Sequence, residues 1–259
     1  MFQVMKKGET FKTTSFYKDN DLPLWCLRSR ANSVKRVAEL LPRTISMMEK
    51  LEISNGDQSQ LQANLESKAI LATGKKDAHG RAIIWMLEQH HVDARQSSPR
   101  NMSRLVATVF LHALRDTGVQ KHGFVFHVNS SRAKLMDVMF FSKAFLGTVV
   151  PNMPMRVGCI FIINPPWVVS QIVYPVLATF ISAKMRQSRV LIHGARKELW
   201  AARLACFDVP DSSLPIGLGG LDYVNCDACI ESVAVWLLAN TAPQDAVKQD
   251  KDMGVQSIN

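Results

Sequence analysis

A run of apolar residues near the middle of the chain stops abruptly at two prolines. Cys159 to Ile163 are all apolar and mostly β-branched or aromatic, which is typical of a strand covered on both faces. Asn164-Pro165-Pro166 ends this strand, because proline donates no ladder hydrogen bond and keeps the residue before it out of the helical region. The pattern predicts a buried strand followed at once by a different structure.

The segment after the prolines predicts a helix without a polar side. From Pro166 to about Ile181 nearly every position is apolar, and such a helix is buried or lines an apolar cavity. Pro175 predicts a kink, and the helix is short for a membrane span, which needs roughly 20 residues. A basic turn, Ser182 to Arg189, leads to a second apolar strand, Val190 to Gly194. Together they predict a βαβ crossover whose helix either bounds an apolar pocket or is an ordinary buried crossover helix.

Strand and helix patterns alternate through the rest of the chain. The predicted strands are Ala69 to Ala72, Ala82 to Leu87 and Gly123 to Val128, of which the first two form a hairpin. The predicted helices are Ser103 to Arg115, the methionine- and phenylalanine-rich Ala133 to Leu146, Ala195 to Ala205, and Glu231 to Ala239. The alternation predicts an α/β fold, with a mainly parallel sheet flanked by helices that enclose an apolar pocket.

A small all-α helical domain is predicted before the first strand. Its two helices are Asp21 to Leu27 and Ser33 to Leu51, and Glu52 to Gln60 is a polar linker. We therefore divide the chain into a flexible basic N-terminus (1–20), a helical domain with its linker (21–60), an α/β domain (68–239) and a disordered tail (240–259).

Charge and cysteine content narrow the class of partner. The 259 residues carry a formal net charge of +9, which favours acidic partners. The aromatic residues lie mostly within apolar runs and not among basic residues, so anionic lipid is favoured over nucleic acid. No secretory signal and no long apolar span is evident, and five scattered cysteines fit reduced thiols. We expect a soluble, cytoplasmic protein that associates peripherally with membranes and is a monomer.

A different class of function rests on Cys226 and Cys229. This C-x-x-C pair is predicted just before a helix, where a thiol pKa would be lowered, so a thiol redox enzyme is the outside alternative. One such pair is only half of a zinc site, so we expect no metal. The sequence contains neither a G-x-S-x-G nucleophile elbow nor a nucleotide-binding glycine fingerprint placed after a strand. We expect no catalytic residues, no enzymatic activity and no cofactor apart from a bound lipid.

Four short motifs follow one another along the α/β domain. Asp77 to Ile83 reads D-A-H-G-R-A-I, and Gly158 to Trp167 reads G-C-I-F-I-I-N-P-P-W. Lys184 to Gly194 reads K-M-R-Q-S-R-V-L-I-H-G, and Leu214 to Gly220 reads L-P-I-G-L-G-G. In this order they resemble the motifs D-x-x-G-R-P-V, G-x-h-x-h-I-N-x-P, K-h-R-x-R-I-x-h-H-G and L-P-x-x-h-G-G of the CRAL-TRIO family of lipid-exchange and lipophile-binding proteins, with Ala82 in place of the first motif's proline. Order and spacing agree from about residue 68 to 221, within the α/β domain.

The resemblance implies a function. The helix Trp167 to Ile181 would be a gate over a deep apolar cavity, opening at a membrane so that one phospholipid or isoprenoid-type lipophile leaves and another enters. The implied pocket and gate residues are Trp167, Val169, Ile172, Val173, Val176, Leu177, Phe180, Met136, Met139, Phe140, Phe161 and Ile163. Those for a headgroup or an anionic membrane, phosphoinositides included, are Lys184, Arg186 and Arg189. The alternative is a lipid-sensing regulator that presents its ligand to a partner.

The resemblance leaves the headgroup open. Phosphatidylinositol-binding members of the family have a glutamate shortly before the Arg-x-Gly of the central strand. In this chain that place falls at about Met155. Phosphatidylinositol transfer is therefore one possibility within the lipid-carrier class, and a tocopherol-like or retinoid-like ligand is another.

Overall fold

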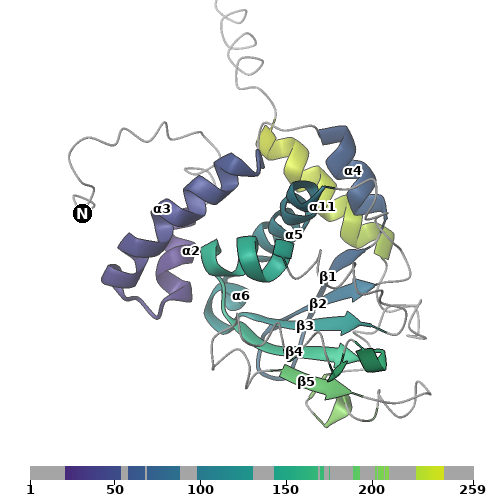
Figure 1. Ribbon diagram of the computed structural model, residues 1–259. Helices are drawn as coiled ribbons and strands as arrows, with labels where there is room; N and C mark the ends of the chain where they lie inside the picture. Colours follow the sequence, from purple (N-terminus) through teal and green to yellow (C-terminus); the bar gives the residue numbers. More distant parts are fainter. Residues whose placement is uncertain are drawn as a thin grey trace, which may run out of the picture.

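A single mixed sheet organises the molecule (Figure 1). The computed structural model describes residues 21–53, 58–67, 69–87, 98–130, 143–168, 170–171, 175, 189–192, 202, 204–206, 208–209 and 226–241. The five strands are β1 (Ile70–Lys76), β2 (Ala82–Leu87), β3 (Phe124–Asn129), β4 (Val157–Ile163) and β5 (Arg189–Ile192), and they lie in this order across the sheet. β1 is antiparallel to β2, and the other neighbours are parallel. The predicted α/β fold is confirmed.

The strand predictions agree closely with these bounds. The first two predicted strands pair as the expected hairpin, although β1 continues to Lys76. β4 and β5 are parallel neighbours, as the predicted βαβ unit requires. The connecting segment and the predicted helices Ala133 to Leu146 and Ala195 to Ala205 lie largely outside the described residues.

The described helices precede, connect and follow these strands. They are α2 (Leu22–Ser29), α3 (Val34–Lys50), α4 (Gln58–Glu66), α5 (Pro99–Ala113), α6 (Thr117–His122), the π-helical η1 (Lys143–Val149), the 3₁₀ turn η2 (Val150–Asn152) and α11 (Cys226–Thr241). Helices α4, α5 and α11 lie above the β1 end of the sheet in Figure 1.

Two predicted boundaries were wrong. Helix α4 begins at Gln58, inside the stretch that the sequence predicts as a linker, because Leu61 and Leu65, one turn apart, are both buried. Helix α11 begins at Cys226, so the C-x-x-C pair occupies its first turn and does not precede it. In both cases tertiary packing extends a helix into a segment whose local sequence is polar or mixed.

Local chemistry fixes where the helices around the sheet begin and end. Ser98 caps α5, because its Oγ accepts from the backbone N–H of Asn101 at 3.2 Å. Asp116 caps α6 by accepting from the backbone N–H groups of Gly118 and Val119. Gly123 ends α6 at φ 88°, where a Cβ atom would collide with the carbonyl oxygen of Arg156.

The two faces of the sheet follow from the register. Trp85, His127 and Phe161 are paired across β2, β3 and β4 and therefore point to one face. Phe126 and its partner Ile160 point to the other face, which we call the crossover face. Helix α5 and η1 pack on the crossover face, with Phe110 from α5 at 4.9 Å from Phe124 and Phe145 from η1 at 4.8 Å from Phe126 between ring centroids. Both faces are buried.

The N-terminal helices are anchored to the sheet domain. Arg156, just before β4, donates from Nε to the Ser29 carbonyl at 2.6 Å and from Nη2 to the Arg28 carbonyl at 3.2 Å. Arg28 in turn donates to Oε1 of Gln120 at 2.6 Å. Because Leu22 and Trp25 belong to the same buried apolar cluster as the sheet, α2 shares the core of the α/β domain.

Candidate functional site

The end of β4 is the part of the predicted lipid site that the structure describes best. Asn164 adopts a left-handed conformation (φ 49°) directly after the strand, which turns the chain out of the sheet. The two residues after the prolines are strongly exposed for apolar side chains, Trp167 at 70% and Val168 at 45%. An exposed tryptophan beside an exposed valine is typical of a surface that contacts a partner or a membrane interface.

Four of the predicted site residues lie among the described ones. Trp167 is exposed, Phe161 and Ile163 are fully buried on β4, and Arg189 is the first residue of β5. Val169, Ile172, Val173, Val176, Leu177, Phe180, Met136, Met139, Phe140, Lys184 and Arg186 lie outside the described residues. The site assignment therefore stays a prediction for most of its members.

Phe161 and Ile163 lie on the face of the sheet opposite the crossover face. The Phe161 ring contacts His127 at 5.1 Å between centroids, and Trp85 contacts the same imidazole edge-on at 4.4 Å. Among the described residues, neither ring nitrogen of His127 has a hydrogen-bond partner. Complete burial lowers the pKa of His127 to about 3, so the imidazole is neutral at pH 7. This trio forms a buried layer around an uncharged histidine.

The crossover face carries an apolar surface that sequence reasoning did not assign to the site. It consists of Phe126 from β3, Ile160 and Ile162 from β4, and Phe145 from η1, all buried. The sequence gives no signal that separates these residues from Phe161 and Ile163, because β4 is apolar at every position. Only the register against β3 assigns alternate residues to the two faces.

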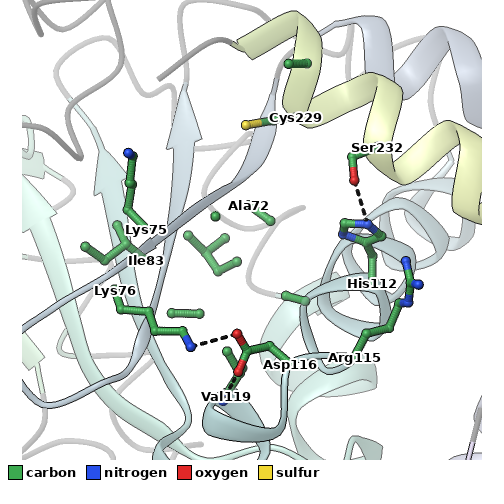
Figure 2. A pocket seen from close by; sticks show the side chains of 15 residues that line it. Ala72, Lys75, Lys76, Ile83, His112, Arg115, Asp116, Val119, Cys229 and Ser232 are labelled. Carbon is green, nitrogen blue, oxygen red and sulfur yellow. Dashed lines mark hydrogen bonds and ion pairs between the residues drawn. The ribbon is translucent and has the colours of Figure 1, made fainter. Parts of the chain in front are cut away.

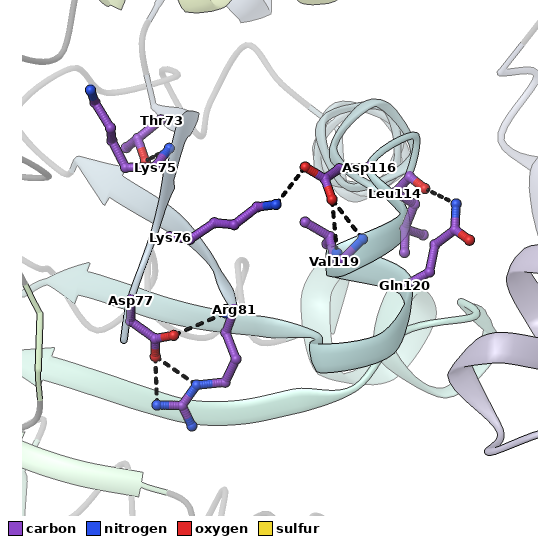
Figure 3. Close-up of polar contacts among 10 residues, drawn as sticks. Thr73, Lys75, Lys76, Asp77, Arg81, Leu114, Asp116, Val119 and Gln120 are labelled. Carbon is purple, nitrogen blue, oxygen red and sulfur yellow. Dashed lines mark hydrogen bonds and ion pairs between the residues drawn. The ribbon is translucent and has the colours of Figure 1, made fainter. Parts of the chain in front are cut away.

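The Asp77 to Arg81 turn, which carries the opening motif of the resemblance, has a structural role (Figure 3). Asp77 Oδ2 lies 2.6 Å from both Nε and Nη2 of Arg81, and Oδ1 accepts from the backbone N–H groups of His79 and Arg81. The Asp77 side chain is completely buried. Arg81 also lies against Gly158 of β4, where a Cβ atom would come within 2.7 Å of its Cδ. The motif therefore holds the β1–β2 turn against β4.

A separate hollow lies at the other edge of the sheet, beside β1 (Figure 2). It has a volume of about 480 Å³ and lies between β1, the C-terminal end of α5 and the first turns of α11. Its polar lining includes Lys75, Lys76, His112, Arg115 and Ser232. No sequence motif indicated this site, because its residues come from three separate segments.

Cysteine and metal-ligating side chains are described for only part of the chain, and the side chain of Cys226 lies outside that part. Within them, no group of three or more histidine, cysteine, aspartate or glutamate side chains is placed to hold a metal ion. Cys229 is partly buried and outside any disulfide. Burial raises the pKa of the Cys26 thiol to about 12 and also raises that of Cys159, so neither is an activated nucleophile.

No helix in the described part of the chain is long and apolar enough to cross a membrane.

Comparison with known proteins gives one family and a distant structural neighbour. The family model described as CRAL/TRIO domain matches residues 65–220. The fold resembles the crystal structure of Sfh5 with a TM-score of 0.48 and 14% identity, over 69% of this chain and 65% of that chain. No curated protein matches by sequence. Since the family match spans more than half of the sequence and contains the whole five-stranded sheet, this chain belongs to the CRAL/TRIO domain family.

Proposed function

We propose that this protein holds one hydrophobic ligand, a phospholipid or an isoprenoid-type lipophile, in a gated cavity and exchanges it at membranes. Membership of the CRAL/TRIO family supports lipid binding or transfer as the general activity. The gate and the exchange at membranes are our proposals. The observation that carries them is the apolar β4–β5 unit, with two parallel neighbouring strands and an exposed Trp167 where the chain leaves β4.

Strand order indicates which face of the sheet the cavity would use. β2, β3, β4 and β5 are successive parallel neighbours, and parallel crossovers are nearly always right-handed, so successive crossovers pass over the same face. The first two place α5 and η1 on the crossover face. A right-handed connection from β4 to β5 would bring the predicted gate to the same face, where it would enclose a cavity with Ile160, Ile162 and Phe145.

Exchange of this kind needs no bond chemistry. Its main barrier is exposure of the acyl or isoprenoid chain to water, which costs about 0.8 kcal/mol per CH₂ group. An apolar cavity that opens only at a membrane avoids that cost. Under this proposal the protein is a carrier without catalytic residues and needs no cofactor besides the lipid.

Membrane contact would begin at Trp167 and Val168. Tryptophan favours the membrane–water interface, because one end of its ring system is apolar and its N–H can bond to water or headgroups. The net charge of +9 would strengthen attraction to anionic lipid. Lys184, Arg186 and Arg189 are the basic residues nearest in sequence to the proposed gate, and we propose that they contact headgroups, phosphoinositides included.

A vesicle-to-vesicle transfer assay tests the proposal. Donor vesicles with a self-quenched fluorescent phospholipid are mixed with unlabelled acceptor vesicles that contain phosphatidylserine. The protein should speed the rise in fluorescence at far less than one protein molecule per transferred lipid. Val173→Asp, in the proposed gate, should abolish transfer, whereas the surface change Lys35→Asp should leave it intact. A redox enzyme would instead lose activity in the Cys226→Ser, Cys229→Ser variant, which should transfer lipid normally. Failure to transfer phospholipids and isoprenoids alike would overturn the carrier function.

A further inference from the structure

We propose that the hollow beside β1 is a second binding site, distinct from the lipid cavity, for a small single-tailed amphiphilic anion. The ligand would place a short apolar body between β1, α5 and α11, and its carboxylate or phosphate group at the basic rim. Three independent features of the described residues support this proposal: a space built from small side chains, a bulge in β1, and an excess of positive charge.

Small residues create the space. Ala72 and Ala82 face the hollow from the sheet, Ala113 from α5 and Ala228 from α11. At each of these places a larger apolar side chain would fill the gap between strand and helix, as such residues do elsewhere in this core. The volume of about 480 Å³ lies within the range of known small-molecule pockets, which is roughly 300–1,000 Å³.

A bulge in β1 keeps the hollow open. The register of β1 against β2 changes from Ala72 opposite Ile84 to Lys76 opposite Ala82, so β1 has extra residues in this interval. Gly74 lies in it with a φ of 68°, a conformation that glycine adopts without strain. Thr73 fixes the bulge, because its hydroxyl donates to the Ile83 carbonyl at 3.0 Å. The same hydroxyl accepts from the backbone N–H of Lys75 at 3.2 Å (Figure 3).

The charges around the hollow favour an anion. Three of its lining residues have basic side chains, Lys75, Lys76 and Arg115, and Asp116 is the one described carboxylate among them. Lys76 Nζ lies 2.7 Å from Asp116 Oδ2, and this hydrogen bond holds the pKa of Asp116 below its usual value. Lys75 and Arg115 have no acidic partner among the described residues, and they lie on opposite sides of the hollow in Figure 2. Among the described lining residues, positive side chains therefore outnumber negative ones by three to one.

His112 and Ser232 form a polar but uncharged patch beside Arg115, where α5 faces α11 across the hollow. His112 Nε2 lies 3.1 Å from the hydroxyl oxygen of Ser232. Burial, and then the neighbouring Arg115, lower the pKa of His112 to about 4, so the imidazole is neutral at pH 7. An apolar ligand body fits walls of alanine, isoleucine and neutral imidazole, and a single anionic head would lie beside either Lys75 or Arg115.

This site is separate from the proposed lipid cavity. His112 and Ala113 of α5 line the hollow, whereas Phe110 of the same helix contacts Phe126 and Phe145 on the crossover face. Helix α5 therefore stands between the two regions, and the hollow lies at the β1 edge while the proposed gate joins β4 to β5. Occupancy of one site can be measured without reference to the other.

Protection of Cys229 from alkylation gives a readout confined to the hollow, because its thiol lines it and is partly buried. The full chain is treated with iodoacetamide, and the rates at Cys229 and at the exposed Cys206 are followed by peptide mass spectrometry. Octanoate and octyl phosphate are the probes, used below their micellar concentrations. At ten times its Kd, either probe should slow alkylation of Cys229 about tenfold and leave the rate of alkylation of Cys206 unchanged.

Controls separate charge recognition from apolar binding. Octanol, which has the same tail without a charge, should protect at least tenfold more weakly, and Lys75→Glu with Arg115→Glu should abolish protection by the anions. The matched variant Lys35→Glu with Arg36→Glu, on the exposed side of α3, changes the net charge by the same amount and should retain protection of Cys229 by the anions. Ala228→Leu, at an exposed position, should fill the hollow and also prevent protection. The proposal would be overturned if octanoate and octyl phosphate left the rate of alkylation of Cys229 unchanged, or if octanol protected Cys229 as well as they do.

Discussion

The buried His127 makes the stability of this protein sensitive to acid by an amount that can be worked out from the structure. Burial lowers the pKa of His127 from 6.5 to about 3. In the unfolded chain the imidazole takes up a proton near pH 6.5, whereas in the folded protein it stays neutral until near pH 3. Between these values the unfolded state binds more protons, so the free energy of unfolding falls as pH falls.

The magnitude follows from the same pKa values. The stability associated with neutral His127 is fully present above pH 6.5 and is lost progressively down to pH 3, by about 5 kcal/mol in total. Between pH 7.5 and pH 5 the loss is about 2 kcal/mol, a large part of the 5–15 kcal/mol typical of a folded domain. Because neither ring nitrogen has a partner in the described part of the chain, an apolar replacement leaves no described polar group unsatisfied.

Replacement of His127 by leucine tests this reasoning. Urea unfolding followed by circular dichroism at pH 7.5 and pH 5 gives the free energy of unfolding of each variant. We expect His127→Leu to be at least as stable as the parent at pH 7.5 and to lose about 2 kcal/mol less on acidification. His122→Gln, at an exposed position, is the control and should keep the parent's acid sensitivity. If His127→Leu loses as much stability as the parent between the two pH values, the assignment of a neutral buried imidazole is wrong.

Three other substitutions test separate parts of the account. Asp77→Ala leaves Arg81 without its buried partner and should lower the free energy of unfolding by about 3 kcal/mol. The control Glu39→Ala, at an exposed position of α3, should change it little, and equal effects would contradict the anchoring role. Arg156→Leu removes the hydrogen bonds to α2, so amide exchange in α2 should accelerate more than exchange in β3, and uniform acceleration would argue against a local anchor. Trp167→Ala should weaken sedimentation with phosphatidylserine vesicles several-fold without changing the unfolding midpoint, and unaltered binding would remove Trp167 from the membrane surface.

The sequence predicted the sheet well because strand signals here are strong and local. Cys159 to Ile163 is apolar throughout and ends at two prolines, so both its type and its C-terminal limit are determined within a few residues. Helix boundaries were less predictable where packing decides them. Helix α4 has few apolar residues, and its helical state depends on the burial of Leu61 and Leu65 against distant segments.

The faces of the sheet could not be predicted from the sequence. In a strand buried on both sides, every position is apolar, and no periodicity shows that Phe161 points away from the side on which Phe126 and Phe145 meet. The hollow beside β1 was unpredictable for a different reason. The hollow exists because its alanine and glycine residues have no side chains large enough to fill it. These residues are distant in sequence and come together only when α5 and α11 pack against β1.

Native mass spectrometry of the purified protein, followed by extraction and identification of any bound lipid, tests the central claim most directly. The account predicts a complex with one lipid molecule per chain, or uptake of one molecule when an empty protein is incubated with phospholipid or isoprenoid vesicles. A phospholipid would indicate exchange, phosphatidylinositol would show that Met155 does not exclude its headgroup, and a tocopherol-like or retinoid-like molecule would indicate a lipophile carrier. A protein that is isolated empty and takes up no lipid from any of these vesicles would contradict lipid carriage as the function of this fold.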